Sequence, residues 1–267
     1  MVLGILGGCG PAAGAHFYSR LVALTEAKRD SDHVDVLLSG RASTPDRTQA
    51  ILHGGESPVD ALIRDAAFLA EGGADLLVLL CHTAHAYLSE LRAALHIPIL
   101  DMVSVTVGEV WRLGARRLGV LCTAGTRRAR LYERAAADYG ITILYPSLPS
   151  QEGLNNLIYE VLKRGRTDFG AAVRTAVADL AALGCDAVSL SCTELSLPQA
   201  TGGAAHFFWR DPPGAILPMP MIDPIELTAR RAILACGKRL KRKEEHHAPV
   251  KATVISCRRS PAGRGMG

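Results

Sequence analysis

Two apolar runs of this chain end in nearly the same way, and this internal repeat constrains its fold more than any other feature. The segment "GGADLLVLLCHTA" runs into Cys81, and "LGCDAVSLSCTEL" runs into Cys192, 111 residues later. The segments "VLGILGGCGP" and "RLGVLCTAGT" match at nearly the same offset. Two matching pairs in register predict two similar halves within one chain.

Short apolar runs alternate with amphipathic segments along most of the chain. This alternation is typical of parallel sheets covered on both faces by helices, so we predict an α/β protein. The expected strands are residues 2–6, 35–40, 75–80, 117–122, 141–145 and 187–191. The expected helices are residues 14–28, 56–71, 84–95, 125–138, 149–164 and 168–183.

The repeat also predicts the domain organisation, with a cleft between two pseudo-symmetric halves. Pro98 and Pro220 are the expected crossings between the halves. The Gly/Pro-rich segment 201–220 is expected to be an irregular loop. The predicted units are a first half over 1–100, a second half over 101–222, a helix over 223–238 that packs back on the first half, and a disordered tail over 239–267.

The net charge of +4 comes from the C-terminal segment. From Lys238 onward there are nine Lys/Arg against two Asp/Glu, whereas the rest has 21 basic and 24 acidic residues. We therefore expect no nucleic-acid partner, and a weak contact between the tail and an anion is the alternative to a solvated end. No apolar run reaches the roughly 18 residues of a membrane span and no signal peptide is recognised, so we expect no membrane contact. A cytoplasmic location with seven reduced cysteines follows as the default.

The loop after the first strand is rich in glycine. Gly8-Cys9-Gly10 opens a formal match to the dinucleotide fingerprint G-x-G-x-x-A. However, the second strand ends "LLSGRAS" and lacks the acidic residue that holds a ribose. Pro11 suits a first helical turn, whose N–H groups would face the strand ends. A small-carboxylate site, a plain tight turn and a nucleotide site all stay open.

The segment "RASTPDRTQAIL" follows the second strand at the edge where α/β sheets bind ligands. Pro45 and Asp46 indicate a turn, and Asp46 can cap the following helix. Arg47 can bind a carboxylate with two hydrogen bonds, although a surface arginine is the simpler interpretation from chemistry alone.

The paired cysteines are the strongest signal, because symmetry would bring both strand ends to one cleft. A metal site could use Cys81, His82 and His85, but Cys192 has no Cys or His close to it in sequence. A redox dithiol is the second possibility, although the chain has no C-x-x-C. The third is proton transfer between two thiols on opposite faces of a stereocentre, which suits a substrate and product that are mirror images.

The motifs "GILGGCGPAA", "PDRT", "CHTAH", "TAGT" and "SCTEL", in this order, resemble the aspartate/glutamate racemase family over about residues 2–235. The resemblance is greatest to the cofactor-independent aspartate racemase branch. It implies two pseudo-symmetric α/β domains, a site between them, an amino-acid substrate, no cofactor, no metal and a homodimer. It also implies that Cys81 and Cys192 are the catalytic bases.

The resemblance implies roles for further residues. Arg47 and Lys163 match family positions that bind the side-chain carboxylate of the amino acid. Glu194 matches the "CTE" motif of aspartate racemases, where glutamate racemases more often have "CTH". In the family, polar residues hold the α-carboxylate and the amino group of the amino acid, and the matching residues here are Thr83, Thr123, Thr126 and Thr193.

Two residues depart from the family patterns "GGMGP" and "CNTAH". Cys9 adds a third thiol near the cleft, in a slot that we also assign to substrate binding. His82 replaces an asparagine, and it could become cationic and lower the pKa of Cys81, or narrow the pocket and alter specificity. His85 matches the family and is expected at a helix start, with a role as a base as the alternative.

The expected function is cofactor-independent racemisation of an acidic amino acid, aspartate first and glutamate second. A pyridoxal enzyme needs a Schiff-base lysine, and only Lys28 and Lys163 precede the basic tail, both in expected helices. The alternatives are a hydantoin racemase or maleate isomerase of the same superfamily, or an amino-acid binding protein without activity.

Overall fold

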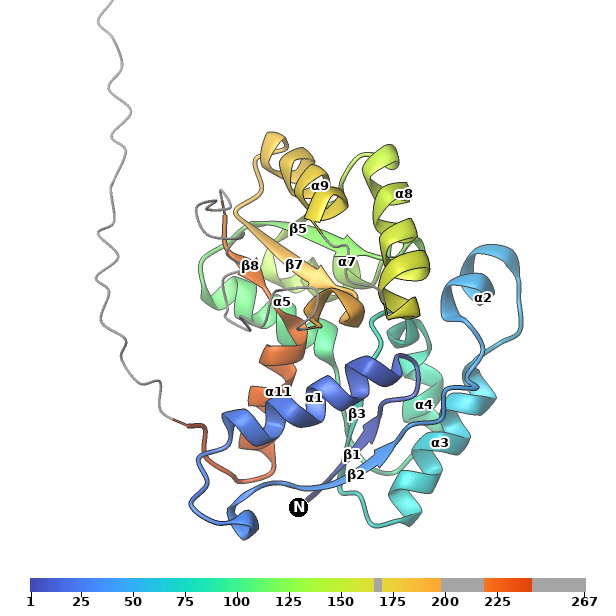
Figure 1. Cartoon of the computed structure of the whole chain (residues 1–267), viewed down its shortest axis with the longest axis vertical. Coiled ribbons are helices and arrows are strands. Elements are labelled where there is room, and N and C mark those ends of the chain that lie inside the picture. Colours follow the sequence, from blue (N-terminus) through green and yellow to red (C-terminus); the bar gives the residue numbers. More distant parts are fainter. Residues whose placement is uncertain (166–169, 198–218, 242–267) are drawn as a thin grey trace, which may run out of the picture.

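The computed structural model describes residues 1–165, 170–197 and 219–241. It contains two four-stranded parallel sheets, each flanked by helices, in two halves that lie one above the other in Figure 1. The strand orders are β2-β1-β3-β4 and β6-β5-β7-β8, which are equivalent positions in the two halves. The predicted α/β fold with a repeated half is confirmed.

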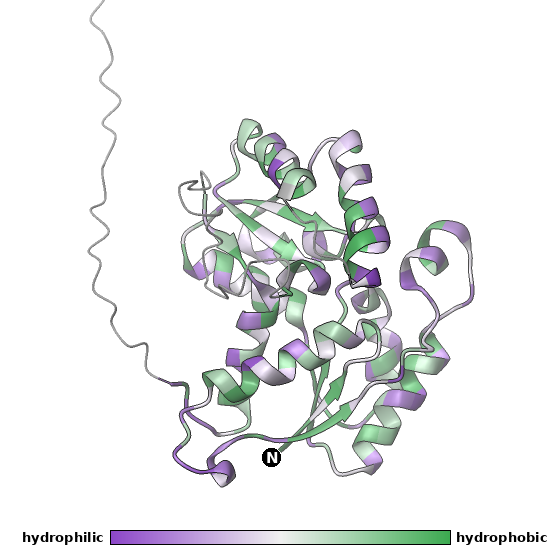
Figure 2. Ribbon diagram, in the orientation of Figure 1, coloured by the Kyte–Doolittle hydropathy of each residue, from purple (hydrophilic) through white to green (hydrophobic). Residues whose placement is uncertain are grey.

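The strands place two buried segments at the centre of the molecule. The first sheet contains β1 (Val2–Leu6), β2 (Asp35–Ser39), β3 (Leu76–Leu79) and β4 (Ile99–Leu100), and the second contains β5 (Arg117–Cys122), β6 (Thr142–Leu144), β7 (Ala187–Ser191) and β8 (Met221–Ile222). Every residue of β3 and β7 is buried, and Figure 2 shows the strands mainly in the hydrophobic colour. Strands β4 and β8 were not predicted, because two residues are too few to show a period.

The predicted helices differ from the observed ones mainly at their ends, whereas the helix over Met102–Arg112 was not predicted. The observed helices are α1 (Pro11–Leu24), α2 (Arg47–His53), α3 (Val59–Glu71), α4 (Leu88–Ala94), α5 (Met102–Arg112), α6 (Ala124–Arg128), α7 (Leu131–Ala136), α8 (Leu148–Asn156), α9 (Gly170–Ala182) and α11 (Pro224–Ala235). The helix expected over 125–138 is two helices, because Arg130 adopts a left-handed φ of 54°. Helix α8 continues as one π turn over Leu157–Val161 and a 3₁₀ turn over Leu162–Arg164. Lys28 lies beyond the end of α1 rather than in a helix, contrary to expectation.

Each half contributes one helix that packs in the core of the other half. Helix α5 follows β4 of the first sheet, but its Val107 packs in the core of the second half with Val120. Helix α11 follows β8 of the second sheet, but its Ile225 packs in the core of the first half with Phe17. Figure 1 shows α11 beside α1. The crossing helices therefore fasten the two halves to each other.

Each crossing helix begins at an aspartate cap. The Asp101 carboxylate accepts hydrogen bonds from the backbone N–H groups of Val103 and Ser104. The Asp223 carboxylate accepts in the same way from the N–H groups at the start of α11 and from the Ser196 hydroxyl at 2.7 Å. The pseudo-symmetry therefore extends to the helix caps.

The C-terminal segment stays attached to the first half further than expected. We predicted a tail from residue 239, but Leu240 forms an antiparallel bridge with Thr25, and the N–H of Lys241 donates to the Leu24 carbonyl at 2.7 Å. Residues 242–267 of the expected tail, and most of the loop expected over 201–220, lie outside the described residues. Within the described ranges, no helix is long and apolar enough to cross a membrane.

Candidate active site

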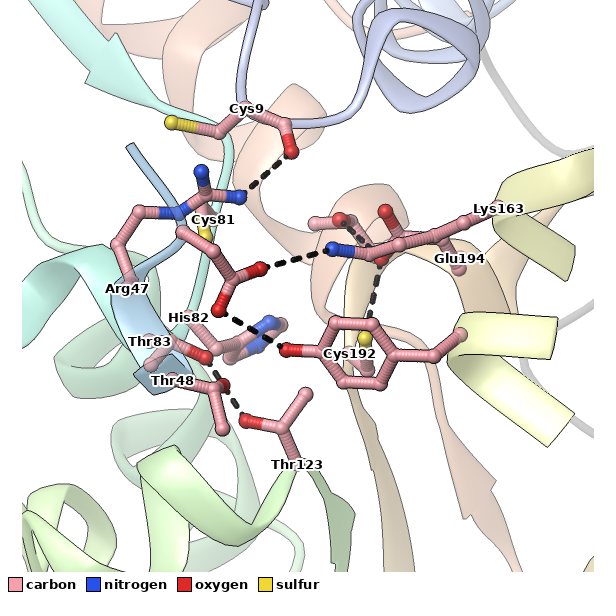
Figure 3. A pocket seen from close by; sticks show the side chains of 13 residues that line it. Cys9, Arg47, Thr48, Cys81, His82, Thr83, Thr123, Lys163, Cys192 and Glu194 are labelled. Carbon is pink, nitrogen blue, oxygen red and sulfur yellow. Dashed lines mark hydrogen bonds and ion pairs between the residues drawn. The ribbon is translucent and has the colours of Figure 1, made fainter. Parts of the chain in front are cut away.

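A cleft opens between the halves where β3 and β7 end, and it contains both cysteines of the repeat (Figure 3). Its internal volume is about 10 Å³, room for about one water molecule. The lining residues are Cys9, Asp46, Arg47, Thr48, Cys81, His82, Thr83, Thr123, Tyr159, Lys163, Cys192, Thr193 and Glu194. The structure thus brings together every predicted site residue except Thr126, which is fully buried directly behind the lining.

Cys81 lies among groups that favour the thiolate. A hydrogen bond from the Cys9 side chain lowers the pKa of Cys81 to about 5, against burial and with help from the Arg47 guanidinium. The backbone N–H of Ala84 lowers the pKa of Cys81 further. At neutral pH, Cys81 is therefore equipped to accept a proton.

Cys192 lies in the opposite environment. Burial, followed by the neighbouring Glu194 carboxylate, raises the pKa of Cys192 well above its usual value. The Cys192 thiol donates to Glu194 Oε2 at 3.0 Å, and the Thr193 hydroxyl donates to the same oxygen at 3.2 Å. At neutral pH, Cys192 is therefore equipped to donate a proton.

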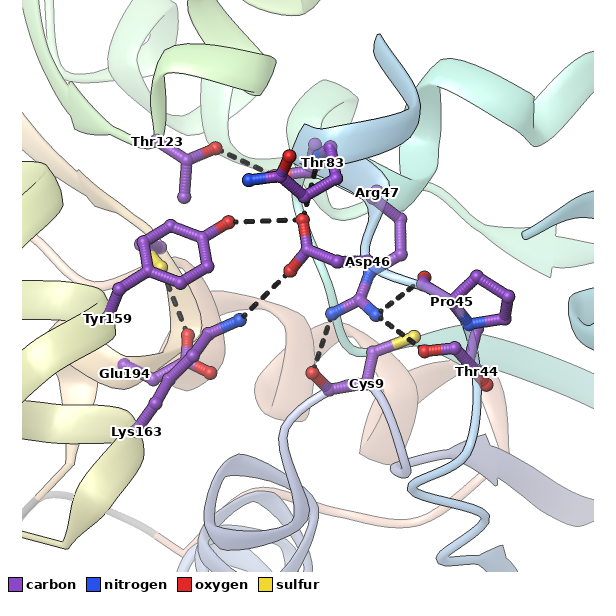
Figure 4. Close-up of polar contacts among 12 residues, drawn as sticks. Cys9, Thr44, Pro45, Asp46, Arg47, Thr83, Thr123, Tyr159, Lys163 and Glu194 are labelled. Carbon is purple, nitrogen blue, oxygen red and sulfur yellow. Dashed lines mark hydrogen bonds and ion pairs between the residues drawn. The ribbon is translucent and has the colours of Figure 1, made fainter. Parts of the chain in front are cut away.

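Arg47 begins α2 and is 6% exposed. Its Nη atoms donate to the backbone carbonyls of Thr44, Pro45 and Cys9 at 3.2, 3.0 and 2.8 Å (Figure 4). Its buried Nε has no hydrogen-bond partner among the described residues. The guanidinium therefore holds the loops around Cys81 in place and also interacts with the Cys81 side chain.

Asp46 connects the two halves across the cleft. Its carboxylate caps α2 through the N–H of Gln49, as predicted, and lies 3.8 Å from Lys163 Nζ. The Tyr159 hydroxyl donates to it at 3.4 Å, and Lys163 Nζ lies 4.5 Å from the centre of the Tyr159 ring. Asp46 thus balances the positive charge of Lys163 at one wall of the cleft (Figure 4).

Three threonine hydroxyls form a closed set of hydrogen bonds between the halves. Thr83 Oγ1 lies 2.8 Å from Thr123 Oγ1 and 2.9 Å from Thr126 Oγ1, and the latter two are 3.2 Å apart. Each hydroxyl has one hydrogen, so a ring of three bonds uses every donor, and Thr123 Oγ1 also accepts from the backbone N–H of Thr126 at 3.2 Å. Thr83, which lines the cleft, keeps a lone pair that can accept from a ligand.

His82 is 2% exposed, and neither of its ring nitrogens has a hydrogen-bond partner in the part of the chain that the structure describes. Its ring stacks on Tyr132 with 6.2 Å between centroids. Burial, followed by the nearby His85, lowers the pKa of His82 well below its usual value. His82 is therefore neutral at neutral pH, which contradicts the expectation that a cationic His82 lowers the pKa of Cys81.

His85 lies in the 3₁₀ turn Thr83–Tyr87, near the expected helix start, and does not line the cleft. Its Nε2 accepts from the N–H of Met102 at 3.3 Å, so Nδ1 carries the proton and donates to the Cys81 carbonyl at 2.9 Å. Both ring nitrogens are thus used to anchor the strand end that carries Cys81. A role for His85 as a base has no support in this geometry.

Three residues of the cleft were not predicted from the sequence: Asp46, which was expected only as a helix cap, Thr48 and Tyr159. Asp46 and Thr48 flank Arg47 within "PDRT", so their place in the motif was the available signal. Tyr159 precedes Lys163 by four residues, which is one helical turn and was also detectable. In the described ranges, no group of three or more His, Cys, Asp or Glu residues is arranged to hold a metal ion.

Comparison with known proteins supports the resemblance seen in the motifs. The model of the Asp/Glu/Hydantoin racemase family matches residues 6–232. An aspartate racemase structure from Picrophilus torridus is 28% identical, with a TM-score of 0.74 over 90% of this chain and 96% of that one. The broad specificity amino-acid racemase RacX of Bacillus subtilis (strain 168) is 25% identical over 199 residues, 73% of this chain and 86% of the relative. The structure of an aspartate racemase homologue from Pyrococcus horikoshii OT3, 21% identical with a TM-score of 0.67 over 88% of this chain and 98% of that one, shares the fold.

The family match and the similar proteins define the class, an enzyme that racemises amino acids. The chain belongs to the Asp/Glu/Hydantoin racemase family.

Proposed function

We propose that this enzyme racemises an acidic amino acid, aspartate first and glutamate second, without a cofactor and with Cys81 and Cys192 as the two bases. One observation carries the proposal: the two thiols come from opposite halves to one cleft, and their surroundings favour opposite protonation states. Proton transfer to one face of a carbon and from the other requires one thiolate and one thiol.

In the proposed reaction, the Cys81 thiolate removes the Cα proton and the Cys192 thiol delivers its own proton to the opposite face. The product is the mirror image of the substrate, and the enzyme is left with Cys81 protonated and Cys192 ionised. The same steps in reverse convert the other enantiomer. Negative charge that develops on the α-carboxylate is stabilised by backbone N–H groups of the turns that begin at Thr83 and Thr193.

The contacts of Asp46 suggest how an acidic substrate is held. A substrate carboxylate can replace Asp46 at Lys163 Nζ, 3.8 Å away, in a cleft that the Arg47 guanidinium also lines. Asp46 is then available to the substrate ammonium, together with the lone pair of Thr83. Because the cleft as it stands has room for only about one water molecule, its lining residues rearrange when the amino acid enters.

The Asp46–Lys163 pair also favours a second candidate, racemisation of neutral amino acids. If Lys163 stays paired with Asp46, it cannot offer a full charge to a substrate side chain. The broad specificity of the Bacillus subtilis relative agrees with this alternative. Rates with aspartate, glutamate and neutral amino acids measured side by side distinguish the two.

The test of the mechanism is the replacement of each cleft cysteine. Cys81→Ala and Cys192→Ala should each lower the racemisation rate by at least about 10²-fold, because each removes one proton-transfer group. Cys236→Ala is the matched control, since this cysteine lies in the core beside α11 and should leave the rate unchanged. Full activity in both single variants would contradict the two-thiol mechanism.

The homodimer that the family resemblance implies and the cytoplasmic location expected by default stay predictions.

A further inference from the structure

The cleft contains a third thiol, which the two-thiol mechanism does not use. Cys9 lies on the loop between β1 and α1 and lines the same cleft as Cys81 and Cys192. The side chains of Cys9 and Cys81 both line this cleft and pack against one apolar cluster of the first half. Figure 3 shows Cys9 and Cys81 on the same side of the cleft, beside Arg47.

The backbone around Cys9 is held on three sides. A Cβ atom on Gly8 would lie 2.1 Å from the Arg41 carbonyl oxygen, and one on Gly10 would lie 2.7 Å from Glu194 Oε1. Arg47 Nη2 donates to the carbonyl of Cys9 itself at 2.8 Å. The Cys9 thiol is thus carried by a loop with little freedom, which also touches the carboxylate partner of Cys192.

We propose that Cys9 is a positioning residue for the racemase reaction: its thiol donates a hydrogen bond to Cys81 Sγ and keeps Cys81 as the thiolate of the resting enzyme. This rests on the proposed function, because it explains how one of two chemically identical bases begins without its proton. Cys9 itself transfers no proton to or from the substrate.

The proton of the Cys9–Cys81 pair is held by Cys9, and the other partners of each thiol explain why. The charged and titratable groups that act on the pair are Arg47, Glu194 and Asp65. Cys81 has the N–H of Ala84 as an additional donor, whereas Cys9 faces the Asp65 carboxylate. The hydrogen bond to Cys81, followed by burial, raises the pKa of Cys9 well above its usual value. Two thiols that share a proton in this way stabilise one thiolate, as in other paired-thiol sites.

The test is a titration of the Cys81 thiolate by its ultraviolet absorbance, with Cys81→Ala as the blank, in the full-length enzyme. Wild type should titrate near pH 5, the value of the Cys81 pKa. In Cys9→Ala the donor is lost and the thiolate fraction at about pH 6 should fall severalfold. In Cys9→Ser the hydroxyl can still donate a hydrogen bond to Cys81, so the thiolate fraction of Cys81 should be close to that of wild type. In each variant, the acid limb of the pH profile of kcat/KM should shift by the same amount as the Cys81 titration.

Cys236→Ala controls for the loss of a buried thiol outside the cleft and should titrate as wild type does. An unchanged Cys81 titration in Cys9→Ala would overturn the proposal, and so would a Cys9→Ser variant that titrates like Cys9→Ala. The absorbance measures the ionisation of Cys81 without turnover, so its result tests this proposal independently of whether the two-thiol mechanism is correct. Loss of the two-thiol mechanism would appear instead as full activity in Cys81→Ala.

Discussion

Two chemically identical side chains have different roles in this cleft because of the residues that surround them. Cys81 lies beside a thiol donor and a guanidinium, and its pKa is about 5. Cys192 lies beside the Glu194 carboxylate, and burial together with that charge raises the pKa of Cys192. Burial and the carboxylate therefore keep a proton on Cys192 over the pH range in which Cys81 has lost its own.

This difference predicts a wide pH optimum whose position depends on Glu194. The rate should rise with pH through about 5 as Cys81 ionises, and fall only above the usual range of a thiol pKa, where Cys192 ionises. In Glu194→Gln both limbs of kcat/KM should move to lower pH, because the carboxylate raises the pKa of both thiols. Glu160→Gln, an exposed carboxylate on the neighbouring π turn, is the control. An alkaline limb that stays in place would contradict this role of Glu194.

The sequence predicted the residues of the site better than their contacts. Ten of the cleft residues were named from the sequence: the repeat pointed to the two cysteines, because the carboxyl ends of equivalent parallel strands meet at one edge, and the family resemblance added others such as Lys163. The neutral state of His82 depends first on its burial, which no local pattern shows, and then on the nearby His85. The Nη bonds of Arg47 to three carbonyls depend on the loop path and were likewise not predictable.

At the scale of elements, long apolar runs were predicted well and short or irregular segments were not. Strands β1, β5 and β7 have their predicted bounds, since each is buried apart from at most its first residue. The break at Arg130 was missed because its helical pattern continues on both sides. Helix α1 starts earlier than predicted, at Pro11, which the loop analysis had already placed in a first turn.

The cap of α11 is predicted to contribute to the stability of both halves. Asp223→Ala removes the acceptor of two backbone N–H groups and of the Ser196 hydroxyl, and should lower the free energy of unfolding by about 1–2 kcal/mol. Asp223→Asn keeps an amide oxygen as an acceptor, so it should lower the free energy of unfolding by clearly less. Urea denaturation measures both variants. Equal losses in the two variants would show that the cap is not the cause.

At the scale of the whole molecule, the halves are joined twice and meet at one narrow cleft. Helices α5 and α11 each pack on the half opposite to the strand that they follow. The hydroxyl ring of Thr83, Thr123 and Thr126 joins the halves at the back of the cleft, while Asp46 and Lys163 face each other across it. This architecture brings one thiol from each half to the same ligand site, which suits a reaction on the two faces of one carbon.

Solvent deuterium exchange tests the central claim of two opposing bases most directly. L-aspartate and D-aspartate are incubated separately with the enzyme in D₂O, and both enantiomers are analysed at low conversion and at equilibrium. Each reaction should end as a racemic mixture with deuterium at Cα. At low conversion, the newly formed enantiomer should carry deuterium while the remaining substrate keeps its proton, because removal and delivery use different thiols. Deuterium that enters the remaining substrate as fast as the product would contradict two opposing bases.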